Sequence, residues 1–398
     1  MKARNTNTVS VFKGSERAGQ LTRSQHGASF TYAAAYLAAH REESAGVALR
    51  MPPRVEPYEV FGTNLHPYFA NLLPEGVRLR ALVRAVKTSE DDLFSMLVAS
   101  GADTIGDVVV SEGELPPERA PVADTTKLAS TSFAALLQES LRYEEGRGDV
   151  SIAGVQPKVS AAMISFPVRA HDKQHAYILK LSPPEYPKLV ENEAFFMAVA
   201  KTAGLDVART RVVHDRQGES GLLVERFDRT THGARLHQED ACQLLDRYPA
   251  DKYRLTLREV SDAMEVCSAP TAERLKLLRM QTFSYLIANG DMHAKNVSVR
   301  VIDGRIALTP CYDLLSTLPY GDRRLALSIE GRDDKLKRAH LIAFGERVGL
   351  RQPAVEQMIA TLTRYVGAAL PRLAEIGLPP KQTQHLTGLL RTRLAQLA

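Results

Sequence analysis

The first 115 residues alternate between short apolar runs and a longer helical repeat. Residues 9–12 and 29–32 are β-like runs around a glycine-containing turn, and residues 108–110 predict a returning strand. Between residues 65 and 97, hydrophobic side chains recur at helical spacing and are expected in the core. They are Leu72, Leu73, Leu79, Leu82 and Val83. This pattern predicts a small α+β subdomain over residues 1–115.

A stretch rich in proline and charge, residues 113–125, has little to bury and predicts a linker. Residues 116–235 then have the pattern of a β-rich lobe with one helix. The helix is expected at 191–203, where Phe195 and Val199 share one face. Four segments carry the strand pattern: residues 158–166, 176–181, 211–214 and 221–226.

Residues 236–398 are mainly helical in pattern and are expected to form the C-terminal lobe. The segment 271–288 keeps its apolar residues near one stripe, as a buried helix requires. Two later segments flank an Asp-Gly dipeptide, which predicts a hairpin because this dipeptide tolerates positive φ. They are residues 297–301 and 306–309. Leucines and valines at three-to-four spacing then predict further helices in the tail.

Composition and charge change this picture little. The 398 residues carry 44% hydrophobic and 24% charged side chains, as soluble globular proteins do, and the length favours two or three lobes. The net charge of +5 is spread along the chain and forms no basic tail. The three cysteines lack CxxC spacing, which argues against a zinc site or a disulfide framework. With no apolar leader and no long apolar segment, we expect a soluble, cytoplasmic protein without a membrane partner.

The main candidate site is the sequence NGDMHAKN, residues 289–296, between the buried helix and the hairpin. Protein kinases place an aspartate and, five residues later, an asparagine in a loop with this setting, and Asp291 and Asn296 have this separation. Asp291 would act on the proton of an attacking hydroxyl, and the Asn296 amide oxygen would hold magnesium. The hairpin then leads to Asp313, a second magnesium ligand that would bridge the metal to the phosphates.

Each of these residues also has a plain structural explanation. An aspartate after glycine or before an apolar run is often a turn residue or a helix cap. Their order along the chain is what makes phosphoryl transfer the better interpretation. His293 is expected to orient the catalytic loop by hydrogen bonding rather than to bind metal. Lys295 is predicted to neutralise the transferred phosphoryl group as a catalytic residue, and a solvated side chain is the alternative.

Nucleotide binding is predicted upstream of this loop. Lys180 ends an apolar strand, where a kinase uses such a lysine on the α and β phosphates and pairs it with a helical glutamate. Glu191 and Glu193 both begin the next helix, where the helix dipole alone would favour them. Only one of them can face Lys180, and Glu193 is the predicted partner, because a buried lysine needs an acidic neighbour or a phosphate.

Two further segments are candidates for contact with the nucleotide. The sequence SIAGVQPK, residues 151–158, stands where a phosphate-covering loop should precede the strand, although no GxGxxG is present. Gly154 would let the backbone approach a phosphate and Lys158 would add charge, with a plain turn as the alternative. Glu225 and Phe227 end a later strand at the position of an adenine-binding hinge, and Phe227 could equally be a core residue.

With these residues in place, the chain resembles the HipA family of bacterial toxin serine/threonine-protein kinases. The resemblance runs over most of the chain, and its motifs are far more specific as a set than singly. They are HPYFANLLPEG at 66–76, SIAGVQPKVS at 151–160, YILK at 177–180, ENEAFFM at 191–197, LLVERFDR at 222–229, HQEDACQLL at 237–245, GDMHAKNVSV at 290–299 and LTPCYDLLS at 308–316.

The resemblance implies a protein-kinase-like, two-lobed α+β fold with an additional N-terminal α+β subdomain and an all-α C-terminal lobe. It implies ATP and Mg²⁺ as cofactors and transfer of the γ-phosphate to serine or threonine of a protein. An aminoacyl-tRNA synthetase is the candidate target, and growth arrest is the expected result. A HipB-like helix-turn-helix antitoxin would neutralise the kinase and connect it to operator DNA.

The same resemblance extends the set of candidate residues. Autophosphorylation of Ser151 in the phosphate loop would switch the kinase off. Tyr312, Asp313 and Leu314 stand where protein kinases carry DFG, and this departure agrees with the HipA pattern. The other residues implied to contact the nucleotide are Ala153, Val155, Gln156, Arg226, His293 and Tyr312.

Three other functions stay open. A dead kinase would serve only as a corepressor of the antitoxin, which the presence of Lys180, Asp291 and Asp313 argues against. A small-molecule kinase would reuse the same acid and amide placement, although the extra subdomain and the HipA motifs favour a protein substrate. A metal hydrolase using His293 is disfavoured, because this histidine has no second histidine at HxH or HxxxH spacing.

Overall fold

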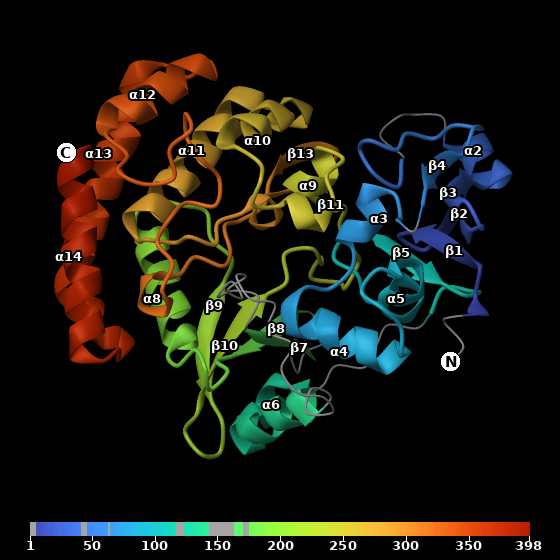
Figure 1. Cartoon of the computed structure of the whole chain (residues 1–398), viewed down its shortest axis with the longest axis horizontal. Coiled ribbons are helices and arrows are strands. Elements are labelled where there is room, and N and C mark those ends of the chain that lie inside the picture. Colours follow the sequence, from blue (N-terminus) through green and yellow to red (C-terminus); the bar gives the residue numbers. More distant parts are fainter. Residues whose placement is uncertain (1–4, 41–45, 63, 117–122, 143–162, 170–174) are drawn as a thin grey trace.

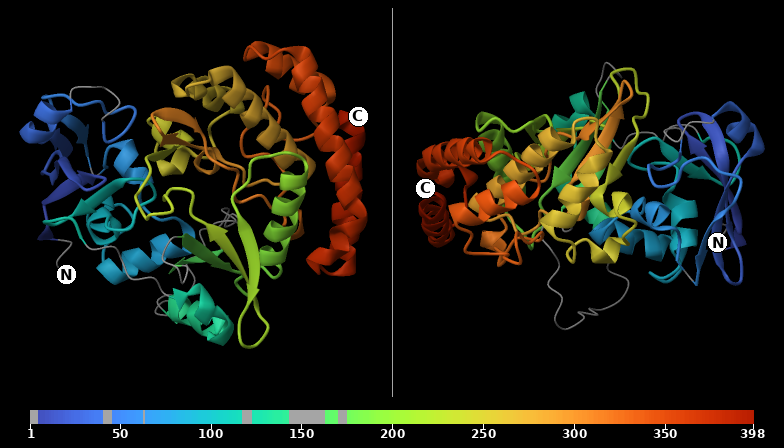
Figure 2. Two further views of the ribbon diagram at one scale, coloured as in Figure 1. Left: turned by 180° about the vertical axis from the view of Figure 1, so that it is seen from behind. Right: turned by 90° about the horizontal axis from the view of Figure 1, so that it is seen from above.

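The computed structural model describes residues 5–40, 46–62, 64–116, 123–142, 163–169 and 175–398. An N-terminal unit lies at one end of the molecule, and long C-terminal helices lie at the opposite end, with a second sheet between them (Figure 1, Figure 2). None of the described helices is long and apolar enough to span a bilayer.

The N-terminal unit is built on an antiparallel five-stranded sheet in the order β4-β3-β2-β1-β5. Its strands are β1 (Thr8–Lys13), β2 (Glu16–Arg23), β3 (Gly27–Tyr32), β4 (Tyr58–Phe61) and β5 (Val108–Ser111). Its helices are α2 (Ala34–Ala39), α3 (Pro67–Asn71), α4 (Gly76–Val86) and α5 (Leu93–Ser100). The strands predicted at 9–12, 29–32 and 108–110 are confirmed. The helical repeat at 65–97 is divided among three helices, because Pro74 and the polar segment 87–92 interrupt it.

The central sheet has the order β6-β7-β8-β10-β9 and is antiparallel except for the β6–β7 pair. Its strands are β6 (Ala123–Asp124), β7 (Ile164–Arg169), β8 (Ala176–Leu181), β9 (Thr210–His214) and β10 (Ser220–Glu225). A 3-10 turn η2 (Thr125–Ser130) and the helices α6 (Phe133–Arg142) and α8 (Leu189–Thr202) complete this lobe. The strand predicted at 176–181 has the bounds of β8. The prediction at 158–166 lies partly outside the described residues, and its described end belongs to β7.

The C-terminal lobe is mainly helical, but it also holds a three-stranded sheet in the order β11-β12-β13. Its helices are α9 (Ala241–Leu244), α10 (Leu257–Ala263), α11 (Pro270–Leu286), α12 (Arg338–Arg347), α13 (Gln352–Ala369) and α14 (Pro380–Leu397). Its strands are β11 (Gln238–Asp240), β12 (Ser298–Ile302) and β13 (Arg305–Leu308). The 3-10 turns are η3 (Pro249–Asp251), η4 (Met264–Val266), η5 (Ala294–Asn296), η6 (Leu318–Tyr320) and η7 (Leu370–Ile376). The lobe expected to be all-α thus includes the predicted hairpin, whose Asp303 and Gly304 adopt positive φ.

Helix α11 is the centre of the main core. Apolar side chains of α8, β10, α11, α13 and α14 pack together there. The C-terminal part of the helix, residues 280–286, is buried, and α13, α14 and β13 pack on the helix (Figure 1). Pro270 occupies its first turn, where the missing N–H removes no hydrogen bond. This rigid helix fixes where the loop of residues 289–296 begins.

A buried guanidinium connects the last helix to the segment after the candidate site. Arg393 of α14 is 1% exposed. Its guanidinium donates to the Asp334 carboxylate and to the Arg323 carbonyl oxygen, each at 2.8 Å, and to the carbonyl oxygen of Tyr285 in α11. Helix α14 therefore holds residues 323–334 against α11.

Replacing Arg393 with alanine is expected to lower the free energy of unfolding by about 3–5 kcal/mol, because Asp334 and two carbonyl oxygens lose a buried, charged donor. The midpoint of urea unfolding, followed by circular dichroism, measures this loss. Arg391→Ala, on an exposed position of the same helix, is the control and should change the free energy by less than about 0.5 kcal/mol. Equal effects of the two substitutions would contradict this role for Arg393.

Candidate active site

A buried ammonium group joins the central sheet to the C-terminal lobe. Lys180 lies on β8 and is 9% exposed. Its Nζ donates to both carboxylate oxygens of Glu193, at 2.7 and 3.0 Å, and also to Oδ1 of Asp313. Glu191 instead pairs with Lys188 at 3.0 Å. The structure therefore places Glu193, and not Glu191, against Lys180.

The charges of this cluster depend on one another. Burial opposes the charged form of Lys180, but the carboxylates of Asp313 and Glu193 outweigh burial and raise its pKa above the ordinary value. Burial also raises the pKa of Glu193 to about 7, although the Lys180 charge acts in the opposite direction. One ammonium thus holds two carboxylates, the buried one of Glu193 and the partly exposed one of Asp313.

The backbone around Asp313 is shaped for this contact. Asp313 has a φ of 55°, in the left-handed region, which turns the chain sharply as it leaves the strand-like residues 311–312. An isolated parallel bridge between Val207 and Cys311 fixes the residues just before it. Asn289 donates from Nδ2 to the carbonyl oxygen of Asp313 at 3.3 Å. The Asp313 segment is therefore tied to the start of the 289–296 loop.

Asp291 is held from three directions. Its N–H donates to Oδ1 of Asn289 at 3.0 Å, and its carbonyl oxygen accepts from Nδ2 of Asn296 at 2.8 Å. The hydroxyl of Tyr253 donates to Oδ1 of Asp291 at 2.6 Å. Burial, and then the charge of Asp291, raise the pKa of Tyr253, so this hydroxyl keeps its proton. The Asp291 carboxylate is 1% exposed and fixed in orientation.

His293 packs beside Tyr253, whose hydroxyl binds this carboxylate. Its ring meets the ring of Tyr253 edge to face at 4.9 Å, and the residue is 2% exposed. Burial, and then the charge of Lys252, lower the pKa of His293 to about 3, so the imidazole is neutral. Its Nδ1 is buried and has no hydrogen-bond partner among the described residues. The ring contact with Tyr253 holds the imidazole in place, and Nδ1 stays available for a further partner.

Lys295 has contacts other than those expected of a phosphoryl-binding cation. Its Nζ donates to the Asp240 carboxylate at 2.8 Å, and to the side-chain and backbone oxygens of Asn71 at 2.9 and 3.0 Å. An ammonium has three donors, and all three are used. A contact between Lys295 and a transferred phosphoryl group would require one of these bonds to break.

The predicted hinge divides into two parts. The rings of Phe227 and Tyr312 face each other at 5.5 Å, and the Tyr312 hydroxyl is 2.9 Å from the hydroxyl of Ser298. Arg226, in contrast, donates to the Asp228 carboxylate at 2.7 and 2.9 Å. Its side chain also reaches Asp103 of the N-terminal unit at 3.4 Å. Glu225 ends β10 and lies 3.7 Å from Arg209. Arg226 and Glu225 are thus engaged in ion pairs, whereas Phe227 and Tyr312 pack on each other.

The predicted phosphate loop lies outside the described residues. This concerns Ser151, Ala153, Gly154, Val155, Gln156 and Lys158.

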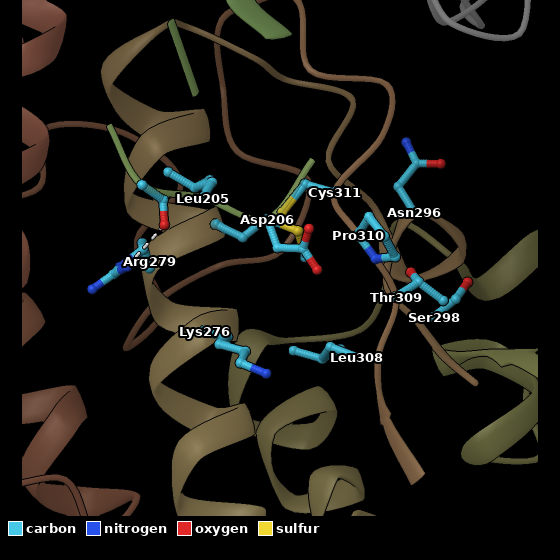
Figure 3. Close-up of a pocket in the computed structure, with 12 residues that line it drawn as sticks. Leu205, Asp206, Lys276, Arg279, Asn296, Ser298, Leu308, Thr309, Pro310 and Cys311 are labelled. Atoms are coloured by element: carbon cyan, nitrogen blue, oxygen red, sulfur yellow. Dashed lines mark hydrogen bonds between the residues drawn. The ribbon is translucent and has the colours of Figure 1, made fainter. Parts of the chain in front are cut away.

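A separate cavity of about 140 Å³ lies between α11, the loop after α8 and the strand that leads to Asp313 (Figure 3). Leu205, Lys276, Arg279 and Cys311 are among the residues that line it, and Asn296 lies at its edge. Lys180, Glu193 and Asp313 do not line it. This cavity therefore adjoins the candidate active site and shares Asn296 with it.

Comparison with known families assigns the chain. Residues 9–111 match the HipA N-terminal domain, and residues 150–370 match the HipA-like C-terminal domain. The chain belongs to the HipA family. The two matched ranges include every residue of the charged cluster described above.

Individual HipA relatives agree with this assignment. The serine/threonine-protein kinase toxin HipA of Shewanella oneidensis is 30% identical over 349 residues, 79% of this chain and 78% of that protein. Y4mE of Sinorhizobium fredii is 31% identical over 386 residues, 90% of this chain and 89% of Y4mE. A chain of the solved Shewanella oneidensis complex of HipA, HipB and operator DNA superposes with a TM-score of 0.75 at 23% identity, covering 98% of this chain and 97% of that one. The predicted HipA-like fold is confirmed.

Sequence reasoning missed several residues of this HipA-type site. Tyr253 and Asp240 contact the loop from 38 and 55 residues away in the chain, so no local spacing points to them. Asn289 was part of the motif, but its amide bridge to Asp313 depends on the hairpin folding back. Asn71 lies in the HPYFANLLPEG segment, which was assigned to the subdomain and not to the site. These four contacts link the catalytic loop to its surroundings.

Replacing Lys180 with methionine is expected to destabilise the protein by about 3–5 kcal/mol at pH 8, because two carboxylates then lie together without their cation. Without the cation, the pKa of Glu193 rises further in the folded state, because the Lys180 charge that opposes the effect of burial is lost. A raised carboxyl pKa favours folding at low pH and opposes it as pH rises, so the loss should be smaller at pH 5 than at pH 8.

Urea unfolding at the two pH values measures this difference. Lys188→Met is the matched control. Lys188 is a more exposed lysine, and it pairs with Glu191 of α8, the helix that also carries Glu193. A loss of stability for Lys180→Met that is independent of pH would show that the carboxylates are not held by this ammonium.

Proposed function

We propose that this HipA family member is an ATP- and magnesium-dependent serine/threonine-protein kinase. The cluster of Lys180, Glu193 and Asp313 carries the proposal. It places one ammonium between a glutamate on helix α8 and an aspartate that follows the β12–β13 hairpin. That arrangement is the one kinases use to hold nucleotide phosphates and metal. The relatives named as kinases support the same conclusion.

The residues present fit magnesium and ATP. Asp313 and Asn296 offer the oxygen ligands that magnesium prefers, and Lys180 can turn from Asp313 to the phosphates while it keeps Glu193. The open Nδ1 of His293 is a further buried polar atom that needs a partner. Bound magnesium and ATP would supply the γ-phosphoryl group and the positive charge that shields it.

The chain's own residues then divide the work. Asp291 accepts the proton of the attacking hydroxyl, and Tyr253 and Asn296 hold Asp291 in place. Phe227 and Tyr312 receive the base between the lobes. Ser151 and the segment around Gly154, which lie outside the described residues, would cover the phosphates.

The biological role belongs to the same proposal. We infer a toxin that phosphorylates a protein, with an aminoacyl-tRNA synthetase as the candidate target, and so arrests growth. A HipB-like helix-turn-helix antitoxin would bind it and connect it to operator DNA. Phosphorylation of Ser151 would switch it off. Family membership and the fold shared with the HipA–HipB–DNA complex support these points.

The proposal predicts magnesium-dependent transfer of radiolabel from γ-labelled ATP to a protein in a cell lysate. Asp291→Ala should lower this transfer about 10²- to 10⁴-fold, because the proton acceptor is lost. Asp313→Ala should lower this transfer to background at any magnesium concentration, because the main magnesium ligand is lost. Asp262→Asn, on an exposed position of α10, is the control and should label like wild type. Equal labelling by all four proteins would rule out this site as the source of the activity.

A further inference from the structure

The turn between α3 and α4 brings the N-terminal unit against the catalytic loop. Helix α3 packs beside α9 and η3 of the C-terminal lobe (Figure 1). This turn belongs to the HPYFANLLPEG segment, to which the proposed kinase mechanism assigns no role. Two of its side chains, Asn71 and Glu75, reach lysines that belong to or adjoin the catalytic loop.

Asn71 binds Lys295, and hydrogen bonds fix the orientation of the Asn71 side-chain amide. Its Nδ2 donates to the carbonyl oxygens of Pro67 and Arg247, at 2.9 and 2.8 Å. These bonds orient Oδ1 toward Lys295, which donates to it at 2.9 Å and to the Asn71 carbonyl oxygen at 3.0 Å. Asp240 takes the third donor. Lys295 is therefore fixed on both sides, and it directly precedes Asn296, whose amide holds the backbone of Asp291.

Glu75 reaches the same aspartate by a second route. Its carboxylate accepts from Nζ of Lys252 at 2.7 Å. Burial opposes its charge, yet Lys295 and Lys252 together lower its pKa, so it remains a carboxylate. The carbonyl oxygen of Lys252 accepts from the N–H of Ala294 in the loop at 3.2 Å. Tyr253, which follows Lys252 in the chain, donates from its hydroxyl to the Asp291 carboxylate.

We propose that Asn71 and Glu75 are positioning residues of the catalytic loop, so that the N-terminal unit is a working part of the kinase site. The proposal rests on the proposed kinase function. Asn71 acts through Lys295 and Asn296 on the backbone of Asp291, and Glu75 acts through Lys252 and Tyr253 on its carboxylate. Lys295 then has a structural role, in which it fixes the loop to Asn71 and Asp240, and it is not the cation that neutralises the phosphoryl group.

The first test compares Asn71→Ala and Glu75→Gln with wild type in steady-state phosphoryl transfer. Both should lower kcat about tenfold to a hundredfold with KM for ATP nearly unchanged, because misplacing a catalytic group slows chemistry while leaving the nucleotide site intact. Arg50→Ala is the matched control. It removes a 3.0 Å hydrogen bond between the N-terminal unit and the Leu244 carbonyl oxygen, a bond that involves no residue of the loop, and should leave kcat within about twofold.

The second test is a double-mutant cycle between Asn71→Ala and Lys295→Met. If Lys295 acts through its contact with Asn71, the two losses in kcat share one cause, and the double variant should be little worse than Lys295→Met. If the fold-losses in kcat of the two single variants multiply in the double variant, the structural role of Lys295 is overturned and a direct role in phosphoryl transfer is supported.

Hydrogen exchange of residues 289–297 provides a readout that needs no catalysis. Faster exchange in Asn71→Ala and Glu75→Gln, but not in Arg50→Ala, supports the proposal even if the wild-type protein transfers no phosphate, an outcome that would refute only the kinase function. Unchanged kcat and unchanged exchange in both variants would overturn it. If Asn71→Ala fails to fold, Glu75→Gln decides, because it keeps the size and shape of a side chain that is 30% exposed.

Discussion

The ammonium of Lys180 is the contact on which the architecture of the site depends. Removing a lysine and two carboxylates from water is costly, and the arrangement is stable only because each carboxylate finds the same cation within hydrogen-bond distance. The three residues come from β8, α8 and the segment after the hairpin. This cation fixes the position of Asp313 relative to the central sheet. Asn289, at the start of the catalytic loop, donates to the Asp313 carbonyl oxygen, so the position of the loop depends on the same contact.

The same device recurs where other parts of the chain meet. Lys295 joins the N-terminal unit, β11 and the catalytic loop through three acceptors. Arg226 and Arg229 share the Asp228 carboxylate while reaching residues of the N-terminal unit. Lys13 and His237 share Asp107. Buried cations with several acceptors thus hold the parts together in fixed geometry, which apolar packing alone specifies less sharply.

Local patterns in the sequence predict only part of this structure. The strand at 176–181 and the hairpin at residues 298–308 were predictable, because period-two apolar residues and an Asp-Gly turn are local signals. Strand β2 was missed, since its sequence ERAGQLTR is polar and becomes a strand only between β1 and β3. The pairing of Lys180 with Glu193 was predictable, because a buried lysine on a strand needs an acidic partner and the next helix begins with two glutamates. The contacts of Asn71, Asp240 and Tyr253 were not, because they join residues far apart in the chain. Arg226 was expected to contact the nucleotide, but its guanidinium donates to the carboxylate of Asp228, two residues later in the chain.

A crystal structure with magnesium and a non-hydrolysable ATP analogue tests the central claim most directly. The account predicts the metal between the Asp313 carboxylate and the Asn296 amide oxygen. It also predicts Lys180 on the phosphates with Glu193 still paired, and the base against Phe227 and Tyr312. Nucleotide bound in the cavity beside Arg279 and Cys311, or a metal that leaves Asp313 unliganded, would contradict it.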